Sequence, residues 1–106
     1  MTNYNAWDAL FECLQAQPRR RLLTELAGYQ PGETVHFTDL RADESAAGTP
    51  IHAEYVHIHL PQLAAAGYIL LDEQTHEVSR GPRFKEIDAF LELIQTHSER
   101  LPDGWV

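Results

Sequence analysis

A helical pattern that ends at Gly67 and leads into a hairpin is the feature that most restricts the fold of this chain. Residues 50–66 carry apolar side chains at helical spacing, and Thr49 and Pro50 suit the cap and the first turn. Gly67 suits the position after the helix, because glycine readily adopts the left-handed backbone conformation required there. Two short β segments around a polar turn then predict a hairpin over residues 68–80.

Pro61 lies inside this helical pattern. It is expected to kink or divide the helix near Leu60, because proline lacks an amide donor and crowds the preceding turn. The side chains expected to face the protein interior are Ile51, Tyr55, Ile58 (or Val56) and Leu63.

The rest of the chain predicts further helices and one strand. Asn5 is expected to cap the first helix and Pro18 to open the second. The expected elements are a helix over 7–14, a helix over 19–29, an edge strand over 35–37, a short helix from Thr38 through Leu40 and Ala42, and a last helix over 83–99. The fold class is therefore mainly α with a small β-hairpin, in the order α-α-β-α-α-β-β-α, which is typical of a winged helix-turn-helix.

Length and charge restrict the classes of protein further. The 106 residues suit one domain, with 18–80 as core and wing and with flanking helices in 1–17 and 82–106. No apolar run is long enough to span a membrane, and the single Cys13 excludes a disulfide framework, so a cytoplasmic protein is expected. Eight Lys+Arg against sixteen Asp+Glu give a net charge of −8, and Lys85 is the only lysine. Bulk acidity argues against nucleic-acid binding, whereas acidic, lysine-poor surfaces also occur in proteins of salt-loving archaea, where salt screens repulsion.

Residues 59–80 carry the pattern HLPQLAAAGYILLDEQTHEVSR, which resembles the end of the recognition helix and the wing of ArsR-like winged-helix regulators. His59-Leu60, Leu63, Ala66-Gly67 and Tyr68-Ile69 match that family's helix end. The segment PRRRLLTEL (Pro18 to Leu26) is similar to its core helix, and the continuation RGPRF is most similar to small winged-helix proteins of haloarchaea. The resemblance covers about residues 8–95.

The resemblance implies a non-enzymatic transcription regulator that binds double-stranded DNA as a homodimer. Its recognition helix would start at Ile51, but this helix lacks the Arg, Lys and Asn side chains that commonly read base edges. The expected DNA contacts are His52, Glu54, Tyr55, His57, His59 and Gln62 on the helix, Arg80, Arg83 and Lys85 at the wing base, and Arg19 and Arg20 in a second basic group. For Tyr55 the helical stripe favours a place in the core over stacking on a base. Arg19 to Arg21 have an alternative role as a solvated first turn.

The last helix has a broad apolar face, and Trp7 and Phe11 also need to be buried. These apolar side chains are more than the domain's own core needs, which favours a two-fold dimer through the terminal helices. The expected dimer interface contains Trp7, Phe11, Phe84, Ile87, Phe90, Leu91, Ile94 and Trp105.

Two other kinds of site are not favoured. His52, His57 and His59 are not spaced four residues apart, which is the helical spacing that lets two histidines share a metal ion, so we expect no metal or cofactor. No nucleophile elbow, phosphate loop or carboxylate pair indicates an enzyme. The alternative function is a winged-helix module that binds proteins and not DNA, which the acidic segment 31–79 favours.

Overall fold

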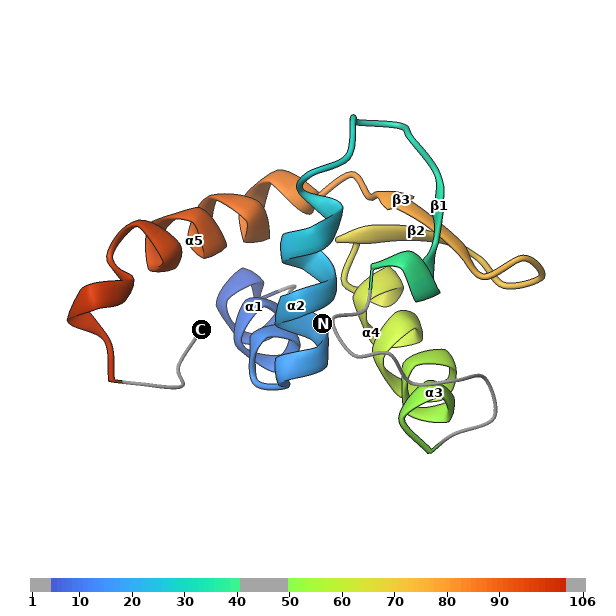
Figure 1. Ribbon diagram of the computed structural model, residues 1–106, viewed down its shortest axis with the longest axis horizontal. Coiled ribbons are helices and arrows are strands. Elements are labelled where there is room, and N and C mark those ends of the chain that lie inside the picture. Colours follow the sequence, from blue (N-terminus) through green and yellow to red (C-terminus); the bar gives the residue numbers. More distant parts are fainter. Residues whose placement is uncertain (1–4, 41–49, 103–106) are drawn as a thin grey trace.

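The computed structural model describes residues 5–40 and 50–102, and its elements follow the predicted order (Figure 1). The protein is mainly helical with a small three-stranded antiparallel sheet, so the expected fold class is confirmed at this level. The elements are α1 (Ala6–Leu14), α2 (Gln17–Leu26), β1 (Val35–His36), the 3₁₀ turn η1 (Phe37–Asp39), α3 (Pro50–Glu54), the π-helical turn η2 (Tyr55–His59), α4 (Leu60–Ala65), β2 (Ile69–Asp72), β3 (Glu77–Arg80), α5 (Phe84–Thr96) and the 3₁₀ turn η3 (Ser98–Arg100).

The first two helices begin where the sequence predicts. The Asn5 side chain accepts hydrogen bonds from the amides of Trp7 and Asp8, at 3.0 and 3.2 Å, and so caps α1. A proline lies in the first turn of α2, where its missing amide costs no helical hydrogen bond. The helix ends at Leu26, earlier than expected, because the Gly28 amide bonds to a carbonyl three residues back and tightens the last turn.

The elements α3, η2 and α4 form one helical segment over residues 50–65. Pro61 does not divide it, because the widened turn η2 precedes the proline and the Leu60 amide donates to the Tyr55 carbonyl five residues back. The extra residue in this turn places His59 below Tyr55 on the inner face. The expected inward position of Ile51 was wrong, since this side chain is 43% exposed. Of the alternatives Ile58 and Val56, Ile58 is 52% exposed and Val56 is partly buried against the core.

The sheet has the order β1-β3-β2, with the 50–65 helical segment between β1 and the β2–β3 hairpin along the chain. Gly67 has φ +85°, and the Tyr68 amide donates to the Leu63 carbonyl, which ends the helix as predicted. Gly81 lies directly against this helix end, and its amide donates to the Tyr68 carbonyl at 2.9 Å. A Cβ at Gly81 would lie 2.4 Å from the Gly67 carbonyl oxygen, so helix end and hairpin base meet backbone to backbone.

The chain between β1 and α3 differs from the prediction. The His36 side chain, and not Thr38, accepts the hydrogen bond that caps the short turn η1. The remainder of the expected short helix, including Ala42, lies outside the described residues.

The hydrophobic core lies where α2, the 50–65 helical segment, the sheet and the first half of α5 meet. The hairpin lies at one end of the protein and α5 extends toward the other (Figure 1). None of the helices in 5–40 and 50–102 is both long and apolar enough to cross a membrane. The largest fully buried side chains include Leu22, Leu23, Leu26, Phe37, Tyr55, Leu63, Tyr68, Phe84 and Ile87.

Candidate functional site

The outer side of the 50–65 helical segment is the first candidate surface. Glu54 and His57 are exposed there, and His52 is half-buried. Gln62 is also half-buried, and it lines a small pocket between α4 and α1, so all four expected DNA contacts reach the surface but not on one side. Ile51 and Ile58 share this exposed side. The surface is thus a mixture of imidazole, carboxylate and apolar groups.

The other two residues expected to contact DNA from this helix face the interior. Tyr55 is 1% exposed and packs against Phe37, with ring centroids 5.8 Å apart. His59 is 6% exposed, and its ring meets Tyr55 edge-on at 5.5 Å. Tyr55 and His59 are therefore parts of the core and not surface contacts, since the turn η2 brings both to the same inner side.

Arg19 is also buried, contrary to the expectation of a phosphate contact. Its side chain is 3% exposed, and it donates to the carbonyls of Cys13 at 3.0 Å and Glu12 at 2.6 Å and to His59 Nδ1 at 2.9 Å. The two carbonyls belong to the last turn of α1, where helical acceptors have no partner within the helix. Arg19 therefore joins α1, α2 and η2, and we refer to these contacts as the Arg19 network.

The Arg19 network determines the protonation of His59. Because a guanidinium only donates hydrogen bonds, Nδ1 is the acceptor and the neutral ring carries its proton on Nε2. Burial, and then the positive charge of Arg19, lower the pKa of His59, and Glu54, whose Oε2 lies 3.7 Å from Nε2, opposes the shift. The Nε2 atom itself is buried without a hydrogen-bond partner in the described part of the chain.

The basic residues at the wing base have different environments. Arg80 donates to the carbonyls of Ala27 and Tyr29, both at 2.8 Å, and its guanidinium lies 4.8 Å from the centre of the Phe84 ring. Arg80 thus fastens β3 to the end of α2, and its position is not that of the expected phosphate clamp. Arg83 is half-buried and pairs with Glu86 at 3.0 Å, whereas Lys85 is exposed.

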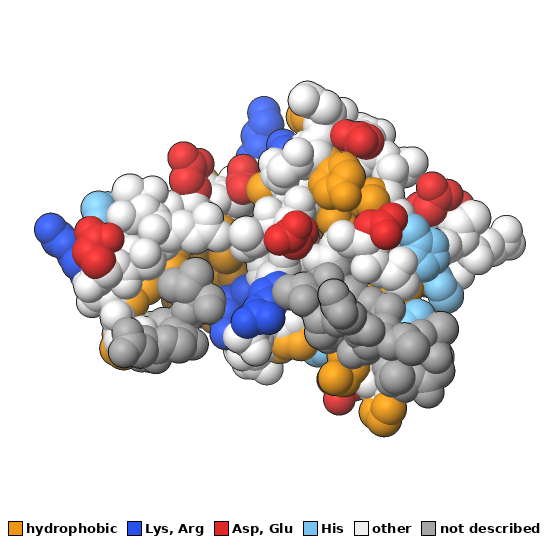
Figure 2. Space-filling model, in the orientation of Figure 1, with side chains coloured by type: hydrophobic (Ala, Val, Ile, Leu, Met, Phe, Trp, Pro, Cys, Tyr) orange, Lys and Arg blue, Asp and Glu red, His pale blue; other side chains and the backbone are white. Residues whose placement is uncertain are grey.

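Arg20 and Arg21 follow Arg19 on α2 but lie closer to solvent. Arg20 is half-buried and donates to the Leu14 carbonyl, and Arg21 is exposed. Figure 2 shows acidic side chains scattered over one face of the protein, with Lys and Arg in small separate groups. The described cations do not form one continuous basic surface along the helix and hairpin.

Three histidines gather around Phe37, which the sequence analysis did not foresee. The rings of His36, His52 and His76 lie 5.3, 5.1 and 5.9 Å from the Phe37 ring, and all three histidines are half-buried. Figure 2 shows histidine side chains in pale blue grouped on one side of the molecule. The pairing of β1 with β3, which the sequence did not specify, brings His36 and His76 together. No group of three metal-ligating side chains is positioned to hold an ion among residues 5–40 and 50–102.

The aromatic side chains of α1 form a second exposed surface. Trp7 and Phe11 are 62% and 55% exposed, their rings stack at 5.7 Å, and Phe11 meets Phe90 of α5 edge-on at 6.4 Å. Of the expected dimer residues, Phe90 and Ile94 are half-buried, and Phe84, Ile87 and Leu91 lie in the protein's own core. The last three are thus unavailable to a partner, and Trp105 lies outside the described residues.

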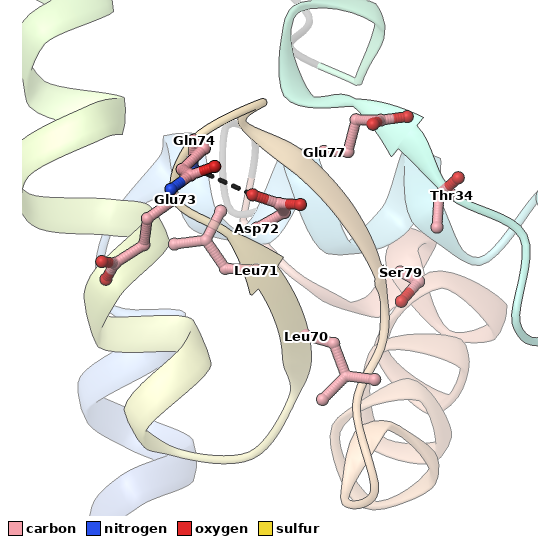
Figure 3. A pocket seen from close by; sticks show the side chains of 8 residues that line it. All are labelled: Thr34, Leu70, Leu71, Asp72, Glu73, Gln74, Glu77 and Ser79. Atoms are coloured by element: carbon pink, nitrogen blue, oxygen red, sulfur yellow. Dashed lines mark hydrogen bonds between the residues drawn. The ribbon is translucent and has the colours of Figure 1, made fainter.

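A shallow pocket of about 640 Å³ lies on the side of the sheet that faces away from the core (Figure 3). Alternation along the strands places Leu70 and Asp72 of β2 on this side, with Glu77 and Ser79 of β3 opposite them. Thr34, which directly precedes β1, also lines the pocket. No arginine or lysine is among the described residues that line the pocket.

Comparison with known proteins gives no match, since no family model, no curated protein and no solved structure is significantly similar to the chain.

Proposed function

We propose that the protein is a homodimeric, non-enzymatic transcription regulator that binds double-stranded DNA through a winged helix-turn-helix. The observation that carries the proposal is the placement of the 50–65 helical segment between β1 and a β2–β3 hairpin, in a sheet of order β1-β3-β2. A helix followed by a wing in this way would occupy the major groove while the hairpin lies near the phosphate backbone.

The side chains available for this role are fewer than the sequence analysis named. His52, His57 and Gln62 would contact bases or phosphates from the helix. Arg83 and Lys85 would contact phosphates beside the hairpin, because both reach the surface there. With so few cations, shape complementarity and water-mediated hydrogen bonds would carry more of the affinity than release of counterions.

A second copy of the chain is the proposed partner of the exposed aromatic surface. Trp7, Phe11 and Phe90 form a continuous group of rings across α1 and α5. Large exposed apolar groups of this kind mark interaction sites on soluble proteins, and a two-fold axis would pair the surface with itself.

DNA binding is tested with a pool of duplexes that have a randomised central segment, by mobility shift at graded KCl. His57→Ala/Gln62→Ala should weaken the selected complex by at least tenfold, because both side chains would contact the DNA. Arg100→Gln, at an exposed cation of η3, serves as a control and should change affinity less than twofold. Equal effects of the two variants, or no complex at any KCl concentration, would contradict the proposal.

The dimer is tested separately by sedimentation equilibrium. The wild-type protein is expected at twice 12.1 kDa, and Trp7→Ser should shift it toward the monomer. Leu70→Ser is the matched control, since Leu70 is 57% exposed but lies on the sheet. A monomeric wild-type protein at about 50 μM, well above a micromolar dissociation constant, would argue against the dimer.

A protein-binding module is the second candidate, and one observation favours it. The exposed side of the helical segment presents Ile51, Ile58 and Glu54, which suit a protein surface better than an anionic duplex. The mobility-shift experiment separates the two functions, because this module would bind no duplex from the pool.

A further inference from the structure

The outer side of the sheet carries two carboxylates in an unfavourable arrangement. Asp72 and Glu77 are direct partners across the antiparallel β2–β3 pair. Directly opposed side chains have Cβ atoms about 5 Å apart, and like charges at this distance repel each other. The Glu77 carboxylate receives no ion pair or hydrogen bond from the described part of the chain, and its cross-strand neighbour on the other side is His36.

Asp72 is fixed as an anion in this position. Its Oδ1 accepts hydrogen bonds from the amides of Gln74 at 2.9 Å and Thr75 at 3.2 Å. These bonds are the main cause of the lowered pKa of Asp72, and they also orient the carboxylate, as Figure 3 shows for the Gln74 amide. The hairpin turn uses only the Oδ1 atom of Asp72, so the Oδ2 atom can still accept a hydrogen bond from a ligand.

Ser79 gives an independent indication of a ligand on the same surface. It is only 7% exposed, and it lines the pocket together with Thr34 and Leu70. Its hydroxyl has no hydrogen-bond partner among the described residues and points into the pocket (Figure 3). Leu70 beside it is 57% exposed and offers an apolar contact.

We propose that this surface, formed by Thr34, Leu70, Asp72, Glu77 and Ser79, is a docking site for an arginine-bearing segment of another protein. We call it the outer sheet site. It goes beyond the proposed DNA-binding function and does not depend on it.

The chemistry of the outer sheet site selects arginine among cationic side chains. A planar guanidinium has five donors, which match two opposed carboxylates and a hydroxyl, whereas a lysine ammonium is a compact point charge. The aliphatic part of the arginine side chain would cover Leu70. The Glu73 carboxylate points away from the other two in Figure 3, so the bridging pair is Asp72 and Glu77.

The test measures binding of a fluorescein-labelled peptide of alternating glycine and arginine by anisotropy. In Asp72→Asn/Glu77→Gln the peptide should bind at least tenfold more weakly. The pair of charges is lost in this variant, while the amide oxygen of the introduced asparagine can still accept the hydrogen bonds of the turn. Ser79→Ala should weaken binding two- to threefold, and the matched glycine–lysine peptide should bind the wild-type protein more weakly than the arginine peptide.

A control is required because a protein of net charge −8 attracts any polycation. Glu92→Gln/Glu99→Gln removes the same charge from exposed positions of α5 and η3, far from the hairpin (Figure 1), and should change affinity less than twofold. Thermal unfolding provides a folding control, because it shows whether each double variant is still folded at the temperature of the binding measurement.

Three results would overturn the outer sheet site. The first is an equal loss of peptide affinity in the two double variants, which would indicate non-selective attraction. The second is no binding of the arginine peptide to the wild-type protein at about 0.15 M KCl. The third is stronger DNA binding by Asp72→Asn/Glu77→Gln than by the control variant, which would place this surface against nucleic acid. Loss of DNA binding in the mobility-shift experiment affects only the proposed function, so the two failures are distinguishable.

Discussion

Replacement of Arg19 by methionine tests the most buried charge of the described protein. Methionine has a similar length and keeps the apolar contacts of the side chain, but it donates no hydrogen bond. The carbonyls of Glu12 and Cys13 and the Nδ1 atom of His59 would then lose their donor. The expected result is a large loss of stability, because the three acceptors remain in place after the donor is removed.

The magnitude follows from the number and type of these bonds. A hydrogen bond to a charged group contributes about 1.5–3 kcal/mol, and three such bonds on one side chain are not additive. Some of the loss is recovered, since burial of the guanidinium itself is costly. We expect a net loss of about 3 kcal/mol, which lowers the melting temperature of a domain of this size by roughly 12–20 °C.

The assay is urea unfolding followed by circular dichroism, with Arg21→Met as the matched control. Arg21 lies two residues along the same helix but is exposed, so its replacement should change stability by about 0.5 kcal/mol or less. Arg19→Lys keeps the positive charge but loses the planar arrangement of guanidinium donors. Its free energy of unfolding should lie between those of the wild type and Arg19→Met. This variant also provides a measurement if Arg19→Met does not fold.

A loss below about 1 kcal/mol for Arg19→Met, or equal losses for Arg19→Met and Arg21→Met, would refute the Arg19 network. An independent measurement is the nitrogen chemical shift of His59. The Nδ1 atom should have the shift of an unprotonated acceptor at neutral pH in the wild-type protein, and a protonated Nδ1 would contradict the hydrogen bond from Arg19.

Three further predictions concern pH and backbone packing. Because the pKa of His59 is lowered in the folded protein, its contribution to stability is present above about pH 6.5 and is lost as the pH falls from there toward the folded-state pKa. In His59→Gln the free energy of unfolding should therefore depend less on pH in this window. The same pH dependence in the variant and the wild type would contradict this prediction. Gly81→Ala should cost more than about 2 kcal/mol in urea unfolding, because the added Cβ meets the backbone of Gly67. Gly32→Ala should lower the free energy of unfolding by only about 1 kcal/mol, because φ is +85° but nothing lies within 4 Å of the added atom. A larger loss at Gly32 than at Gly81 would contradict both predictions.

The ends of the helices could be predicted because they depend on a few local signals. Asn5 caps α1 through its own side chain, and Gly67 ends α4 through its left-handed conformation. Both effects involve residues close in sequence, so the pattern alone was sufficient. The inner face of the 50–65 segment was not predictable from a regular helical period, because η2 adds one residue to a turn just before Pro61.

The bonding of Arg19 and Arg80 within the fold was not predicted, although the sequence carried a signal for each. Arg19 precedes Leu22, Leu23 and Leu26 by three, four and seven residues, so it occupies the first position of their buried stripe. Arg80 lies two residues after Val78 on the same strand and therefore on the same inner side. Helical and strand spacing thus distinguish Arg19 and Arg80 from the other members of their basic groups.

The close approach of Gly67 and Gly81 has a consequence for sequence change over evolutionary time. Neither position has room for a side chain: at Gly67 a Cβ would meet the Arg83 side chain at 2.9 Å, and at Gly81 it would meet backbone. The two sites are therefore constrained together, whereas the side chains of residues 73–75 at the hairpin tip are exposed and freer to vary. His76 is more restricted, because its ring packs against Phe37 and its carbonyl accepts from the Phe37 amide. Homologous chains should keep the glycine pair and differ most at the hairpin tip, so recognition of a new partner would be acquired there without loss of the fold.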